Sequence, residues 1–349
     1  MKYLMIAIPL LLLSCGEDLT KEDLLPEATG EHGHVLVLMD DNLWEGKMGE
    51  ALIAKLDQNA KGPYLRPEPQ FNYFRKKTGS MTHVNKLSRI ILKVMVDHDS
   101  TYAETAIIDK RNYYAKGQIF LVIKDSDPNR LLHFIQNGFQ PVVDRMNNFE
   151  MDALITEFRG KPNNTVKEQA GQKFGIEISL PRDSELKVTK DDFMWVKYDR
   201  SRNLIGNEAS GAKGGVFWIQ EGIVFWSEPF SENGFSREHI LDKRDTILKY
   251  NIPGKVKGSY MATEYDSCCA PVAETFDFLG GSAICIRGLW KHAGHPGAFG
   301  GGPFVQYTIH NKNTNSLVTV CGYVYAPKFN KREYIREVEA MLNTIEFKS

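Results

Sequence analysis

The sequence contains only five cysteines, none of them in a CxxC pair, and it has no long run of charge of one sign. Acidic and basic residues nearly cancel, with a formal net charge of −1, so the basic stripe of nucleic-acid-binding proteins is absent and no nucleic acid partner is expected. The GxSxG, HExxH and EF-hand signatures are also missing, as is a GxGxxG turn after a strand. No local motif therefore indicates an enzyme class, and no cofactor is expected.

A bacterial secretory signal is indicated by the layout of the N-terminus. Lys2 precedes an apolar run over residues 3–13, and Ser14 and Cys15 follow it. The run has about half of the roughly 20 residues that a spanning helix needs, so we expect residues 1–14 to be removed as a signal peptide. The tetrad LLSC resembles the lipobox, whose cysteine receives diacylglycerol, which makes Cys15 the predicted lipidation site and membrane contact. The alternative is an ordinary signal peptide with an incidental cysteine.

The segment after this cysteine predicts a tether. Residues 15–32 are acidic and rich in turn-forming residues, with no apolar periodicity, which is typical of a flexible linker. Gly16 is compatible with transfer to the outer membrane, and Glu17 and Asp18 resemble an acidic surface-export signal. We therefore expect a protein that is lipid-anchored to the outer membrane and faces either the periplasm or the cell surface.

Four further cysteines lie in the last quarter of the chain, and an exported protein can pair such residues as disulfides. Cys268 and Cys269 are adjacent, where a bridge would need a strained geometry. Cys285 and Cys321 lie in apolar strand-like runs, where a free cysteine packs as a small hydrophobe. If a disulfide forms, Cys285 and Cys321 are the predicted pair, provided that their strands are neighbours. The spacing does not predict a metal site.

The first half of the mature chain predicts an α+β domain over residues 33–172. Apolar runs rich in β-branched residues predict strands at 34–40, 88–97 and 117–124. Periodic apolar residues predict helices at 43–57, 128–146 and 148–173, with breaks near Pro141 and Pro162.

The second half, residues 173–349, predicts a domain with an antiparallel sheet. Strands are expected from 173 onward and at 192–200, 214–222, 223–230, 257–265, 282–290, 303–311 and 317–327. Helices are expected at 236–251 and 331–347, both on one face of the sheet. The predicted fold class is thus α+β with two domains, each a mostly antiparallel sheet with helices packed on it.

The stretch RGLWKHAGHPGAFGGGPFVQY, residues 287–307, looks most like a chemical site because it sets two histidines beside six glycines. A phosphate cradle is not indicated, since neither a lysine–serine pair nor a helix follows the glycines. A metal site is not indicated either, because a loop carries His292 and His295 and no acidic residue or cysteine adjoins them. The glycines instead predict a tight connection between two strands.

The same connection is the predicted recognition surface, because aromatic side chains on an ordered loop supply contact area at low entropic cost. The residues expected to contribute are Trp290, His292, His295, Phe299 and Phe304. Arg287, in the strand before the loop, is expected to pair with a buried carboxylate and to have a structural role.

Five segments resemble a known family in sequence and in order. They are VLVLMDDNLWEGKMGEAL, FMWVKYD, GSYMATEY, RGLWKHAGHPGAFGGGPFVQY and CGYVYAPKFNKREYIREVEAML. The chain resembles the uncharacterised Bacteroidetes lipoproteins grouped as domain of unknown function 4837, over essentially the whole mature chain. Ala298, Phe299 and Gly300 stand where that pattern has an acidic residue and a methionine. The resemblance implies a lipoprotein of the cell envelope and implies no activity.

Together these features predict a lipid-anchored envelope protein that works as a binding or assembly module, with an envelope protein or another ligand as its partner. The alternative is an envelope hydrolase with its active site in a cleft between the two domains, where pockets often form. A cleft with histidines or carboxylates of perturbed pKa would favour the enzyme, and an apolar patch around Trp290 and Phe299 would favour the binding module.

Overall fold

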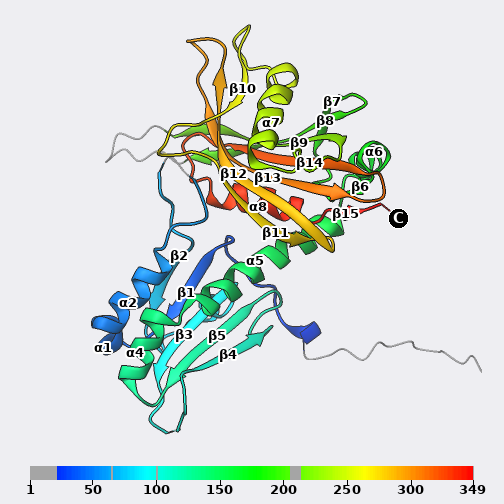
Figure 1. Cartoon of the computed structure of the whole chain (residues 1–349). Helices are drawn as coiled ribbons and strands as arrows, with labels where there is room; N and C mark the ends of the chain where they lie inside the picture. Colours follow the sequence, from blue (N-terminus) through cyan, green and yellow to red (C-terminus); the bar gives the residue numbers. More distant parts are fainter. Residues whose placement is uncertain (1–21, 64–65, 100, 205–213, 349) are drawn as a thin grey trace, which may run out of the picture.

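The structure is a computed structural model, and it describes residues 22–63, 66–99, 101–204 and 214–348 (Figure 1). The predicted signal peptide and Cys15 lie outside the described residues. Two domains are stacked, with helices α5 (Gln140–Gly160) and α8 (Arg332–Leu342) between their sheets. The prediction of an α+β fold with two domains and mostly antiparallel strands is confirmed for the chain as a whole.

The N-terminal domain is built on a five-stranded sheet in the order β2-β1-β3-β5-β4. Its strands are β1 (His34–Leu38), β2 (Asn72–Lys76), β3 (Ile90–Val96), β4 (Ala106–Arg111) and β5 (Ile119–Asp125). Its helices are α1 (Asp41–Trp44), α2 (Lys47–Leu56), α3 (His83–Lys86) and α4 (Pro128–Asn137). Taken alone, this sheet differs from the predicted antiparallel arrangement, because only β4 pairs antiparallel. The helical crossover between β1 and β2 makes parallel pairing possible.

Both faces of this sheet are covered, which explains the unbroken apolar run of the first strand. Val35 and Val37 pack with Leu52 of α2, whereas Leu36 and Leu38 belong to a separate cluster on the opposite face. Strands buried on both faces read as continuous apolar runs, as parallel strands usually do.

The C-terminal domain contains an eight-stranded antiparallel sheet in the order β10-β12-β13-β14-β9-β8-β7, with β11 also paired to β12. Its strands are β7 (Glu185–Thr189), β8 (Phe193–Leu204), β9 (Gly215–Pro229), β10 (Tyr260–Thr263), β11 (Val272–Phe278), β12 (Gly281–Ala293), β13 (Gly301–Asn311) and β14 (Ser316–Tyr325). A small separate pair consists of β6 (Ile176–Glu177) and β15 (Glu346–Phe347). The two strands predicted at 214–222 and 223–230 are one continuous strand, β9.

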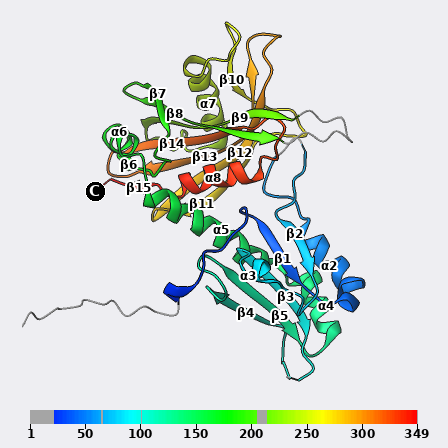
Figure 2. The same ribbon diagram turned by 180° about the vertical axis from the view of Figure 1, so that it is seen from behind.

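Helix α7 (Arg237–Asn251) and helix α8 lie on opposite faces of this sheet (Figures 1 and 2). Ile240 and Leu248 of α7 pack with Trp226, whereas Val338 of α8 packs in the other core with Phe225. Trp226 and Phe225 are neighbours in β9, and successive side chains of a strand point to opposite faces. The prediction that both helices share one face was therefore wrong.

Helix α5 connects the two domains. Its first half packs Val142 and Met146 in the N-terminal core, and its second half packs Leu154 and Phe158 in the C-terminal core. The next helix, α6 (Asn164–Phe174), also packs in the C-terminal core, although the predicted boundary at residue 172 placed it in the first domain.

The ends of these helices follow the sequence signals. Asp127 accepts a hydrogen bond from the backbone N–H of Asn129 at 2.8 Å and caps α4. Pro141 lies in the first turn of α5 rather than inside a broken helix, where its missing N–H costs nothing. Gly175 ends α6 with φ of 64°, a conformation that glycine adopts without steric cost.

The described part of the predicted tether, residues 22–32, lies against the N-terminal domain. It begins with a 3-10 turn, Glu22–Leu24. The backbone N–H of Ala28 donates to Lys116, and that of Thr29 donates to Leu87. His32 contacts the buried carboxylate of Glu150 in α5 through Nδ1 at 2.5 Å. These residues therefore form an ordered strap along the N-terminal domain, and Glu31 reaches Arg202 of the C-terminal domain at 2.8 Å.

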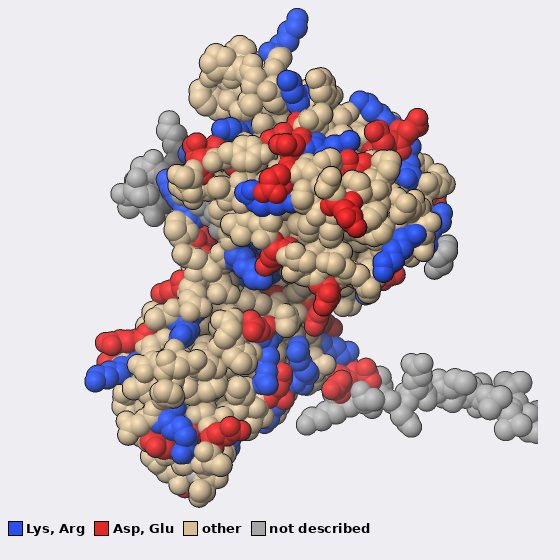
Figure 3. All heavy atoms as spheres, viewed as in Figure 1, with Lys and Arg blue, Asp and Glu red and all other residues tan. Residues whose placement is uncertain are grey.

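Charged residues of both signs are interspersed over the face of both domains shown in Figure 3. Within the described residues, no helix is long and apolar enough to cross a membrane.

Candidate functional site

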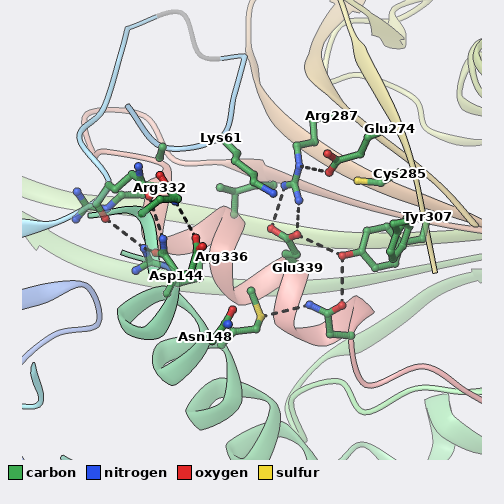
Figure 4. A pocket seen from close by; sticks show the side chains of 18 residues that line it. Lys61, Asp144, Asn148, Glu274, Cys285, Arg287, Tyr307, Arg332, Arg336 and Glu339 are labelled. Carbon is green, nitrogen blue, oxygen red and sulfur yellow. Dashed lines mark hydrogen bonds and ion pairs between the residues drawn. The ribbon is translucent and has the colours of Figure 1, made fainter. Parts of the chain in front are cut away.

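A cleft of about 540 Å³ lies between the two domains, where the hydrolase alternative places its site. One wall comes from α5 and from Lys61 and Gln70 of the N-terminal domain. The other wall comes from α8 and the strands β11, β12 and β13, and Figure 4 shows these side chains converging.

An ion pair dominates the centre of the cleft. The guanidinium of Arg287 donates to both carboxylate oxygens of Glu339, with Nη1 at 2.9 Å from Oε2. The hydroxyl of Tyr307 donates to the same carboxylate at 3.3 Å, and Glu274 lies 3.8 Å from the guanidinium (Figure 4). Arg287 thus pairs with a carboxylate as predicted, but Glu339 is half-buried rather than buried. Glu339 is held as the counter-ion of a largely buried guanidinium and is not a free base.

Cys285 lines the same cleft, but its chemistry does not suit a nucleophile. Burial raises the pKa of its thiol to about 12, so the thiolate is scarce at neutral pH. A reactive cysteine needs a lowered pKa and access to solvent, and this side chain is 2% exposed. Cys285 is therefore a packing residue.

The walls of the cleft are held together by contacts between the domains. Glu68, which is 6% exposed, accepts hydrogen bonds from the backbone N–H groups of Lys331 and Arg332 at 2.9 and 2.7 Å. The carboxylate thereby caps the start of α8 and meets the positive end of its dipole. Arg336 of the same helix donates to the backbone oxygen of Gln70 at 3.2 Å.

A second cavity, of about 380 Å³, lies within the C-terminal domain, and we call it the aromatic pocket. Its floor is the sheet face that carries α7, formed by β8, β9, β12 and β14, and its side is the segment after α7. The aromatic residues that line it are Trp195, Trp218, Trp290, Phe299, Tyr323 and Tyr325. This volume lies in the range of roughly 300–1,000 Å³ that small-ligand pockets have.

Hydrogen bonds and glycines fix the rings of the floor. Trp195 Nε1 donates to the hydroxyl of Tyr323 at 3.0 Å, and Trp290 Nε1 donates to the backbone oxygen of Val324 at 3.0 Å. Tyr323 lies across Gly222 of the neighbouring strand, where a Cβ atom would come within 2.4 Å of its ring. The floor is therefore ordered before any ligand arrives.

The mouth of the pocket carries two aromatic side chains that the fold leaves uncovered. Trp218 is 66% exposed and Phe299 is 87% exposed. Phe299 comes from the glycine-rich connection between β12 and β13, and Trp218 from β9. Large aromatic side chains are usually well buried, so a pair of exposed rings at the lip of a cavity indicates a contact surface.

Polar groups line one side of the aromatic pocket. Lys197 and Asp199 form an ion pair at 3.0 Å, and Gln220 Nε2 donates to Asp199 at 3.1 Å. Nδ1 of His292 is buried without a hydrogen-bond partner among the described residues. Burial lowers the pKa of His292, and a hydrogen bond with the backbone of Tyr260 opposes this shift only in part, so the neutral imidazole is favoured at pH 7.

The comparisons with known proteins identify a family. A family model described as "Domain of unknown function (DUF4837)" matches residues 163–344, which is more than half of the chain. The chain belongs to this family. A second model, also described as a domain of unknown function (DUF8532), matches residues 28–159. The two matches coincide with the C-terminal and N-terminal domains of this DUF4837 protein.

No curated protein matches the DUF4837 chain. Among solved structures, the Ran-binding protein Mog1p of Saccharomyces cerevisiae is similar over 50% of this chain and 91% of its own, with 12% identity and a TM-score of 0.31. A Mog1 mutant is similar over 50% of this chain and 92% of its own, with 11% identity and a TM-score of 0.30. CyanoP of Synechocystis is similar over 47% of this chain and 92% of its own, with 9% identity and a TM-score of 0.24. Likeness at this level carries no argument about fold or activity.

The structure of this DUF4837 protein separates the residues of the predicted recognition loop. Trp290 and Phe304 lie in strands and are 3% and 1% exposed, so neither presents its ring to a macromolecular surface. Trp290, His292 and Phe299 line the aromatic pocket, whereas His295 lies in the exposed turn. Among the described residues, no three His, Cys, Asp or Glu side chains are grouped so that they could hold a metal ion.

The condition on which the Cys285–Cys321 pairing depended, that their strands are neighbours, is not met. Cys285 and Cys321 are both free and buried, and β13 lies between their strands. Their side chains also point to opposite faces of the sheet, since Cys285 packs in the core under α8 and Cys321 in the core under α7.

Sequence reasoning missed four residues of the aromatic pocket in this DUF4837 protein: Trp195, Trp218, Tyr323 and Tyr325. A weak signal was present, because FMWVKYD and GYVYAP each place aromatic residues at alternate positions. Alternate positions of a strand share a face, but the sequence does not say which strands are neighbours.

Proposed function

We propose that the protein is a lipid-anchored binding protein of the cell envelope, held at the outer membrane through Cys15, and that the aromatic pocket is its binding site. The observation that carries the binding role is the pair of uncovered rings, Trp218 and Phe299, above an ordered aromatic floor. The envelope location is supported by the signal layout of residues 1–14 and by the lipobox-like tetrad before residue 16.

Labelled palmitate tests the anchor. We expect the label to enter the wild-type protein and to be absent from the Cys15→Ala variant, because the acyl chains need that residue. Cys268→Ala is the control, since it removes an exposed thiol of the folded domain. Equal labelling of the wild type and Cys15→Ala would contradict the anchor.

Hydroxyl-radical footprinting tests the binding role in the native envelope. We expect Trp218 and Phe299 to be oxidised less in intact cells than in the purified protein, because an occupant covers the mouth of the pocket. Tyr113 of the N-terminal domain, which is 44% exposed, is the internal control and should be oxidised equally in both samples. If Trp218 and Phe299, like Tyr113, are oxidised to the same extent in cells as in the purified protein, an occupied pocket is contradicted.

Hydrolysis in the cleft between the domains is less well supported. The carboxylate at its centre, Glu339, is neutralised by Arg287, and burial raises the pKa of the Cys285 thiol. General acid–base catalysis favours a pKa near the working pH, and the pKa of the Cys285 thiol lies far above it.

A further inference from the structure

The aromatic pocket combines two kinds of surface in one regular array. In the pairing of β8, β9 and β14, Asp199 lies opposite Gln220, and Gln220 lies opposite Tyr325. Two residues further along each strand, Lys197 and Tyr323 lie on either side of Gly222, and the ring of Tyr323 occupies the space above that glycine. Hydrogen-bonding groups and ring faces therefore stand side by side across three strands.

This pattern matches a ligand that is apolar on its faces and polar around its edge. A sugar ring presents C–H groups on its faces and hydroxyl groups around its edge, and each hydroxyl both donates and accepts. Gln220 uses Nε2 on Asp199 and keeps Oε1 as an acceptor.

The charge of the pocket disfavours one competing ligand class. Aromatic cages also bind quaternary ammonium groups through cation–π attraction. Here, however, Lys197 and Lys255 line the pocket, and Asp199 is the single acidic residue among the described residues of the lining, which gives these residues a net positive charge. A neutral or anionic ligand is therefore favoured over a cation.

The position of the pocket disfavours a peptide bound by strand addition. Strands β9 and β14 of the floor are paired on both sides, so their backbone groups already bond within the sheet. Strand addition needs an exposed edge. The exposed rings of Trp218 and Phe299 extend the contact surface beyond the cavity, which suits a ligand longer than the cavity.

We infer that the aromatic pocket binds a neutral or anionic oligosaccharide, with sugar rings stacked on Trp218 and Phe299 and hydroxyl groups bonded to the Asp199–Gln220 row. This inference rests on the proposed binding function and adds the chemical class of the ligand. The faces of the aromatic side chains stack on the sugar rings, and the Asp199–Gln220 row discriminates among sugars through their hydroxyl groups.

Saturation-transfer NMR with the full-length lipidated protein in detergent micelles tests the inference. The probes are maltohexaose, cellohexaose, xylohexaose, mannohexaose, chitotetraose and a hexamer of galacturonic acid, each assayed alone. We expect at least one of them to bind, with saturation strongest at the ring C–H protons. Trp218→Ala should weaken the affinity roughly 3- to 10-fold, as the loss of an aromatic contact does.

Matched variants separate stacking from a loss of folding. Trp218→Phe keeps a ring and should restore part of the affinity, whereas Tyr250→Ala removes an exposed ring outside the pocket and should leave the affinity unchanged. Gln220→Ala should weaken binding of the same sugar. If no oligosaccharide binds, or if Trp218→Ala binds as tightly as the wild type, the inference is overturned.

Two further probes distinguish this failure from failure of the binding function. Octaproline and tetramethylammonium are assayed on the wild type and on Trp218→Ala. If either binds in a Trp218-dependent way while no sugar does, the sugar inference fails and the binding role of the pocket stands. If no probe binds and footprinting shows no protection in cells, both proposals fail.

Discussion

Replacement of Glu150 by glutamine tests the ion cluster that joins the strap before β1 to helix α5. Glu150 has no exposed side-chain surface and is contacted by His32 at 2.5 Å and by Arg89 at 2.7 Å. Burial by itself would raise the pKa of this carboxyl, but the hydrogen bonds from His32 and Arg89 outweigh it and lower the pKa from 4.5 to about 2. The ionised form is therefore the one that stabilises the fold.

The magnitude follows from linkage. A carboxyl whose pKa falls from 4.5 to about 2 on folding stabilises the protein by about 3 kcal/mol at pH 7, at about 1.4 kcal/mol per pKa unit. Because the pKa is lower in the folded state, this stabilisation is present above pH 4.5 and is lost as the pH falls toward 2. Removing one partner of a buried ion pair typically costs a similar 3–5 kcal/mol.

Urea unfolding followed by circular dichroism measures this effect. We expect Glu150→Gln to lower the free energy of unfolding by about 3 kcal/mol at pH 7 and by about 1 kcal/mol at pH 3. Glu157→Gln makes the same change at an exposed position of α5 and should stay within about 0.5 kcal/mol of the wild type at both pH values. An equal loss for Glu150→Gln at pH 7 and pH 3 would show that packing, not charge, is responsible, and would refute the reasoning.

Three further predictions concern the core and the domain interface. Burial and the neighbouring Glu337 carboxylate raise the pKa of Glu221 to about 8, so its contribution to stability is present at low pH and is lost as the pH rises through 8. Glu221→Gln should therefore gain stability relative to the wild type between pH 5 and pH 9 in urea titrations, and a constant difference would contradict this. Glu68→Gln weakens the cap of α8 and should cost roughly 1–2 kcal/mol, seen as faster amide exchange in the first turn of that helix. Unaltered exchange would argue against the capping role. In thiol titration, Cys268 should react in the folded protein and the three buried cysteines only after unfolding, without prior reduction. Thiols that appear only after reduction would reveal a disulfide.

Local sequence patterns predicted some strands of this protein and missed others. The runs at 282–290, 303–311 and 317–327 were expected as strands and lie within β12, β13 and β14. Strands β2, β4, β7 and β11 were not predicted as strands. Their residues are all half-buried or exposed, and so they lack the apolar run that marks a central strand.

Part of the aromatic pocket could also be predicted from a local pattern in the sequence. Trp290, His292 and Phe299 lie close together in the chain, so one glycine-rich stretch drew attention to all three. Trp195 and Trp218 come from other strands and reach the same pocket only through the pairing of β8 and β9. The cleft between the domains was expected in position, but its ion pair joins β12 to α8 over 52 residues of sequence.

The amino-acid sequence by itself determined the helices and central strands of this protein, because apolar periodicity, capping residues and glycines act over a few neighbouring residues. It also determined the signal layout and the candidate lipidation residue, which depend on order along the chain alone. The tertiary structure decided which face each strand residue occupies, that Cys285 and Cys321 lie apart, and that aromatic rings from four strands meet in one pocket. Strand order and the covering of each face depend on contacts between distant segments, and local sequence patterns do not specify those contacts.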